Sequence, residues 1–120
     1  MEQNTQLELS LRELLGEFKG VVGRLLGPCS LDDAFNLAQD ANFATIGLTE
    51  LVYKNGSNGG VSHEEVRTYK GLVVSCLMKF QELIDNPELN GQRWYVDLCR
   101  EQMQGRLELL NEMECYQAAG

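Results

Sequence analysis

The chain has 120 residues and a formal net charge of -8, from 18 acidic and 10 basic side chains. This length fits one domain that can bury a useful core without a metal or disulfides. A composition of 43% hydrophobic and 23% charged residues argues against disorder. The negative charge excludes direct binding to nucleic acid or to anionic membranes as a first expectation. It favours basic partners if it favours any, although solubility alone also explains it.

The segments that would direct the chain to a membrane are not found in the sequence. The first ten residues hold no basic region followed by an apolar run, so we expect no secretory signal. No stretch approaches the roughly 20 apolar residues of a membrane span. The four cysteines, at positions 29, 76, 99 and 115, are widely spaced. We therefore expect a cytoplasmic protein with reduced thiols, while the sequence leaves two disulfides open.

A first helix is predicted over residues 5–26. Its larger apolar side chains recur at alternating steps of four and three residues, which forms a heptad seam that can pack against another helix. Gly16, Gly20 and Gly23 repeat with similar steps on roughly the opposite face. Each glycine weakens an isolated helix by about 1 kcal/mol relative to alanine. Either a second backbone, from this chain or from a partner, packs closely on this glycine stripe, or the helix end is frayed and weakly stable.

A second helix is predicted over residues 31–54. Gly27 and Pro28 end the first helix, and Ser30 supplies the N-cap of the second. A stripe of mostly small side chains along this helix allows a close crossing with a neighbour. Phe43 lies off this stripe, on the polar side. It is either an isolated exposed aromatic, which is common, or a contact residue for a partner.

A third helix is predicted over residues 63–85, after a flexible connection at residues 55–61 that is rich in glycine, asparagine and serine. Ser62 and Glu65 fit a capping box at its start. This helix is the most apolar segment of the chain, and its main stripe predicts core positions. Val74 and Met78 do not belong to that stripe and stand one turn apart on the otherwise polar side. They form an exposed apolar patch, or else the helix is buried on nearly all sides.

A fourth helix is predicted over residues 88–116, because Pro87 ends the third helix and suits the first turn of the next. Gln102 and Arg106 fall in the middle of its predicted apolar face. An unpaired buried charge is costly, so the Arg106 guanidinium should reach a carboxylate or a carbonyl, or extend to solvent. The alternative is that Arg106 belongs to a recognition site. The predicted apolar face consists of Trp94, Tyr95, Leu98, Cys99, Met103, Leu109, Leu110, Met113 and Tyr116.

The residue pattern contains no recognisable catalytic, cofactor or metal site. A di-iron carboxylate bundle needs a Glu-x-x-His motif on each of two helices, and His63 is the only histidine in the chain. Cys29 precedes a helix N-terminus, which is the most favourable setting among the four thiols, but no base accompanies it. We therefore expect no enzyme activity, no cofactor and no metal.

These features predict an all-α protein, an antiparallel four-helix bundle-like single domain over residues 1–120. No family is recognised in enough residue-level detail to carry a function over. The predicted function is a non-enzymatic protein–protein interaction domain of adaptor, chaperone or inhibitor type, with self-association as a homodimer left open. The residues predicted to bind the partner are Phe43, Val74, Met78, Gly16, Gly20, Gly23 and Arg106.

An alternative function follows from the charge and the small size. An acidic protein can mimic nucleic acid and so inhibit a DNA- or RNA-binding machine, as phage-encoded anti-defence proteins do. Glu101, Glu108 and Glu112, which recur at helical spacing, would then stand in for phosphates. Salt dependence separates the two hypotheses, because binding through charges weakens steeply with salt and binding through apolar contacts does not.

Overall fold

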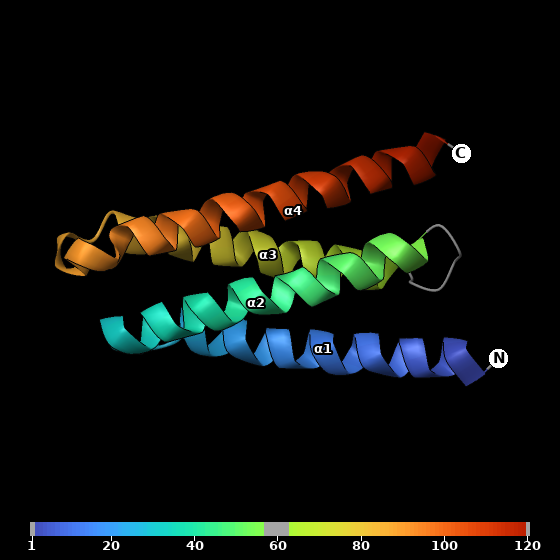
Figure 1. Cartoon of the computed structure of the whole chain (residues 1–120), viewed down its shortest axis with the longest axis horizontal. Helices are drawn as coiled ribbons and strands as arrows, with labels where there is room; N and C mark the ends of the chain where they lie inside the picture. The colour runs from blue at the N-terminus through green and yellow to red at the C-terminus, as the bar shows by residue number, and fades with distance from the viewer. Residues whose placement is uncertain (1, 57–62, 120) are drawn as a thin grey trace.

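The computed structural model describes residues 2–56 and 63–119, and it describes the side chains of residues 11–54, 64–89 and 91–112 (Figure 1). Within these residues the chain is helical and has no strand, so the predicted all-α class is confirmed. Ser62 and residues 57–61 of the predicted connection lie outside the described residues. The elements are α1 (Glu2–Leu26), α2 (Leu31–Gly56), α3 (His63–Ile84), the 3-10 helix η1 (Pro87–Gln92) and α4 (Arg93–Ala119).

The helices pack side by side along an elongated molecule whose principal extents are 50 × 28 × 18 Å. Helix α4 packs against α3 and against α2, helix α1 also packs against α2 and α3, and the contact between α2 and α3 is smaller. The first turn of α1 and the last turns of α2 and α4 lie at one end of the molecule, while η1 lies at the other (Figure 1). These contacts are consistent with a bundle. They give α4 two long seams at the surface, one with α3 and one with α2.

All four helices contribute side chains to one hydrophobic core. Phe18 of α1 and Tyr69 of α3 meet edge to face, with ring centroids 5.6 Å apart. Phe80, Leu48 and Met103 are also fully buried. Each such side chain stabilises the fold by about 1.5–3 kcal/mol relative to an exposed one. The described part of the chain holds no helix long and apolar enough to cross a membrane.

The start of the fourth helix differs from the prediction. Residues 87–92 form the 3-10 helix η1, and the α-helix begins only at Arg93. The backbone N–H of Glu88 donates to Asn86 Oδ1 at 3.0 Å, which tightens the turn after α3. The Arg93 guanidinium then donates to the carbonyl oxygens of Ile84 at 2.8 Å and Asn86 at 3.1 Å. The bond to Ile84 satisfies a carbonyl that the end of α3 leaves open.

The buried face of α4 is turned by roughly a quarter of a turn from the predicted one. Trp94, Leu98 and Leu109 were placed on that face, and all three are exposed. Helix α4 carries more apolar residues than α2 and α3 together can cover, so the pattern alone cannot show which edge of the apolar face is left open. The core positions of α4 are Val96, Cys99, Met103, Leu107 and Leu110.

Candidate docking surfaces

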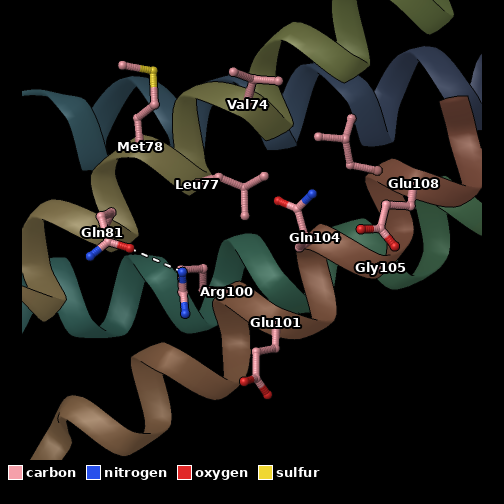
Figure 2. Close-up of a pocket in the computed structure, with 10 residues that line it drawn as sticks. Val74, Leu77, Met78, Gln81, Arg100, Glu101, Gln104, Gly105 and Glu108 are labelled. Atoms are coloured by element: carbon pink, nitrogen blue, oxygen red, sulfur yellow. Dashed lines mark hydrogen bonds between the residues drawn. The ribbon is translucent and has the colours of Figure 1, made fainter.

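Val74 and Met78 lie on the solvent side of α3, with 43% and 71% of their surfaces exposed. Both line a groove of about 600 Å³ between α3 and α4, which Figure 2 shows. We call it the α3/α4 groove. Helix α3 contributes Val74, Leu77, Met78 and Gln81, and helix α4 contributes Arg100, Glu101, Gln104, Gly105, Leu107 and Glu108.

The floor of the α3/α4 groove is apolar, and one hydrogen bond joins its two walls. In Figure 2, Leu77 points toward α4 and Met78 points away from it. Arg100 Nη1 donates to Gln81 Oε1 at 3.1 Å, which joins the two walls. Gly105 leaves the α4 wall without a side chain, and no other residue lies within 4 Å of a Cβ built there. A side chain of a partner therefore has room beside Leu77.

The rim of the groove on α4 is negative. Glu101 and Glu108 are exposed there, and neither carboxylate forms an ion pair within the described part of the chain. The positive charge of Arg100 is already compensated, because its Nη2 lies 2.7 Å from Asp97 Oδ1. The groove thus combines an apolar floor with two free carboxylates.

Arg106 lies at the other seam of α4, between α2 and α4, in contact with neutral groups only. Its Nη1 donates to Asn42 Oδ1 at 2.6 Å and to Thr45 Oγ1 at 3.0 Å. Asn42 Nδ2 in turn donates to Gln102 Oε1 at 2.9 Å. Burial lowers the pKa of Arg106 below its ordinary value, because desolvation disfavours the charged guanidinium. The predicted need for an oxygen acceptor is met mainly by an amide and a hydroxyl rather than by a carboxylate.

The same network continues to α3 through the core. Thr45 Oγ1 donates to the carbonyl oxygen of Asn42 at 2.7 Å. Tyr69 donates its hydroxyl to the carbonyl oxygen of Thr45 at 3.2 Å and lies 2.8 Å from Thr49 Oγ1. Burial raises the pKa of Tyr69 to about 12. These bonds connect three helices and fix the rotation of α2 relative to α4.

Further exposed apolar side chains border the seam between α2 and α4, and sequence reasoning missed part of this surface. Ile46 follows Asn42 by one helical turn, and Tyr53 follows Thr49 by one turn. On α4, Leu98 precedes Gln102 by one turn, and Leu109 follows Arg106 by one turn. We call this surface the α2/α4 flank and define it by Ile46, Tyr53, Leu98, Leu109 and Arg106. The sequence did hold a signal for Ile46 and Tyr53, because they follow the exposed Phe43 at helical spacing, by three and ten residues.

The glycine stripe of α1 packs against no other helix in the described chain. Gly16, Gly20 and Gly23 are exposed, and no residue approaches within 4 Å of a Cβ built on any of them. The interpretation that a second backbone of this chain packs there is therefore wrong. Phe43 is 59% exposed on α2. Of the residues predicted to bind a partner, the structure brings Val74 and Met78 into one groove and places Arg106 at a different seam.

The described thiols and carboxylates do not form a reactive or metal-binding cluster. Cys29, Cys76 and Cys99 are free cysteines. Burial raises the pKa of the Cys76 thiol to about 12 and also raises the pKa of Cys99, which keeps both protonated at neutral pH. Among the described residues, no group of three or more His, Cys, Asp or Glu side chains is arranged to hold a metal ion.

Comparisons of the chain with protein-family models, with curated proteins and with solved structures gave no match. The chain is an all-helical protein with exposed apolar side chains beside both seams of α4, and these surfaces are the features that bear on its function.

Proposed function

We propose that this protein is a non-enzymatic protein–protein interaction domain that binds a segment of another protein in the α3/α4 groove. The observation that supports the proposal is the position of Val74 and Met78, two exposed apolar side chains beside a groove with an acidic rim. In this proposal the four helices form an antiparallel bundle, which presents both walls of the groove as rigid elements. We include a cytoplasmic location in the proposal, because the described cysteines are free thiols.

The chemistry of the groove favours a partner segment that carries apolar and basic side chains. An apolar side chain of the partner would cover Val74 and Met78, and its Lys or Arg residues would pair with Glu101 and Glu108. Exposed ion pairs contribute about 0.2–1 kcal/mol each, whereas burying one large apolar side chain contributes about 1.5–3 kcal/mol. We therefore expect the apolar contacts to supply most of the affinity, and the carboxylates to set the orientation and the association rate.

A random-sequence peptide library displayed on phage tests the proposal. We expect selection on the wild-type protein to enrich peptides that combine apolar residues with Lys or Arg. Their affinity should fall at least tenfold on the double substitution Val74→Glu/Met78→Glu. Ile46→Glu/Tyr53→Glu, which adds the same two negative charges on the α2/α4 flank, is the matched control and should leave these peptides bound. If the selected peptides bound the Val74→Glu/Met78→Glu protein as well as they bound the control protein, the groove would be excluded as their binding site.

The mass in solution, measured by light scattering, examines self-association at the same surface. A wild-type dimer that becomes a folded monomer on Val74→Glu/Met78→Glu would place a second copy of the chain in the groove. A monomer in both cases would leave the groove to a different protein, as we propose. Circular dichroism of each variant shows that the comparison is made between folded proteins.

The exposed carboxylates along α4 support the second candidate function, an acidic inhibitor that mimics nucleic acid. Glu101, Glu108 and Glu112 are all exposed and recur along one helix. A partner bound through such a row should lose affinity by orders of magnitude between about 50 and 200 mM salt. Binding that persists over this range and fails on Val74→Glu/Met78→Glu would favour the docking groove over the inhibitor.

A further inference from the structure

We propose that the α2/α4 flank is a second docking surface, and that it takes an apolar peptide segment whose carboxylate pairs with Arg106. This surface borders the seam of α4 with α2, whereas the α3/α4 groove borders the seam with α3, so the proposal goes beyond the function proposed above. Two independent observations support it, namely the apolar side chains that the fold leaves uncovered and the incomplete hydrogen bonding of one guanidinium.

The first observation is that the exposed apolar residues surround the Arg106 network. Across the seam, Leu98 stands one turn before Gln102, and Leu109 stands one turn after Arg106. On α2, Ile46 follows Asn42 by one turn and Tyr53 follows Thr49 by one turn, and all four side chains are exposed. Exposed apolar side chains beside a polar network are a feature of protein interaction surfaces.

The second observation concerns the hydrogen bonds of Arg106. Only Nη1 has acceptors within the described part of the chain. No buried side-chain nitrogen or oxygen among the described residues lacks a partner, so neither Nε nor Nη2 is fully buried. The Nε and Nη2 edge of a guanidinium presents two parallel N–H groups that match the two oxygens of a carboxylate. This edge is therefore open to a ligand.

The network holds the open edge in place before any ligand arrives. Nη1 is held by Asn42 and Thr45 at 2.6 and 3.0 Å, and Asn42 is held in turn by Gln102 at 2.9 Å. A fixed guanidinium loses little conformational entropy when it binds, which favours affinity. No carboxylate compensates its charge, because its hydrogen-bond partners are amide, hydroxyl and carbonyl oxygens. A carboxylate from a partner would supply the missing negative charge at a half-buried position, where an ion pair is stronger than at the open surface.

The charges on the flank agree with an acidic ligand, even though the whole chain is negative. The carboxylates Glu101 and Glu108 belong to the α3/α4 groove. On the outer side of α2, the carboxylate of Glu50 is paired with Lys54 at 2.8 Å. Arg106 is the charged residue among the five that define the flank. The two seams of α4 then select different ligands, one basic and one acidic.

The displayed peptide library tests this proposal with a second sorting step. Peptides that lose binding to Leu98→Glu and keep binding to Val74→Glu/Met78→Glu are assigned to the flank. We expect these peptides to share an Asp or Glu with apolar residues one turn away. Replacing this Asp or Glu of the peptide by Asn or Gln should weaken its binding to the wild-type protein at least tenfold. The same replacement should not change the binding of the peptide to the Arg106→Gln protein. Thermal unfolding of Arg106→Gln shows whether that variant is folded. If it is not folded, the substitution in the peptide still tests the proposal, because it is measured on the wild-type protein.

Three outcomes would overturn the proposal. Flank peptides that tolerate loss of their carboxylate would show that Arg106 does not select the ligand. The absence of any peptide sensitive to Leu98→Glu would show that the flank is not a docking surface. A wild-type dimer that Leu98→Glu converts to a monomer would show that a second copy covers the flank. None of these results bears on the α3/α4 groove, which has its own sensitive variant.

Discussion

Tyr69→Phe is expected to change how the stability of this protein depends on alkaline pH. The ordinary pKa of tyrosine is about 10, and burial raises the pKa of Tyr69 in the folded protein to about 12. The folded state therefore keeps a proton that the unfolded state loses between these values. The stabilisation from Tyr69 is complete below about pH 10 and is lost as the pH rises through 12.

The size of this effect follows from the shift in pKa. One pKa unit corresponds to about 1.4 kcal/mol, so the rise at Tyr69 from 10 to about 12 corresponds to about 3 kcal/mol of stability lost between pH 10 and 12. Phenylalanine has no hydroxyl to ionise, so Tyr69→Phe should remove this contribution. At neutral pH the same substitution should cost about 1 kcal/mol, because the hydrogen bonds of the hydroxyl to Thr45 and Thr49 are lost.

Urea unfolding followed by circular dichroism at a series of pH values from 7 to 12 provides the assay. Tyr53→Phe is the matched control, since Tyr53 is exposed, and it should leave the wild-type profile unchanged. The thiol of Cys76, whose pKa burial also raises to about 12, adds a separate alkaline loss that Cys76→Ala would remove. If the profile of Tyr69→Phe above pH 10 matched that of the wild type, the hydroxyl would not be buried as described and the reasoning would fail.

Two further predictions concern the stability of the fold. Gly20→Ala should stabilise the protein by about 0.5–1 kcal/mol, because alanine favours the helix and no neighbour lies within 4 Å of the added Cβ; thermal unfolding measures the gain, and a loss would point to a close contact at this position. Phe80→Ala should cost about 3–5 kcal/mol because Phe80 is fully buried, whereas Phe43→Ala should change the free energy of unfolding by less than about 0.5 kcal/mol. Equal effects of the two phenylalanine substitutions in urea unfolding would contradict the assignment of the core.

The sequence was sufficient to predict the helices, because they depend on local periodicity. Val74 and Met78 fall outside the apolar stripe of their own helix, which left either an exposed patch or a helix buried on nearly all sides, and the structure shows that both side chains are exposed. The same reasoning failed on α4, where Trp94 and Leu98 were assigned to the apolar face and are exposed. Which edge of a broad apolar face is covered depends on the neighbouring helices, and local periodicity does not contain that information.

The partners of Arg106 could not be predicted for a related reason. Its position in an apolar face showed that it needed an acceptor, and the acceptor is Asn42, which lies 64 residues away in the chain. An asparagine in a helix of small residues carries no signal that it meets an arginine. Only the packing of α2 against α4 brings the two side chains together.

The position of the single tryptophan gives this protein a built-in optical reporter. Trp94 is the only tryptophan in the chain, and it remains 68% exposed at the start of α4, where its ring meets that of Tyr95 edge to face. Tyr95 in turn contacts Phe35 of α2, with ring centroids 5.3 Å apart. Unfolding should therefore change the indole emission little, because the ring is already in water in the folded state. A ligand that covers Trp94 at the start of α4, next to α2, should shift the indole emission to shorter wavelength. Binding of such a ligand can therefore be followed without a label.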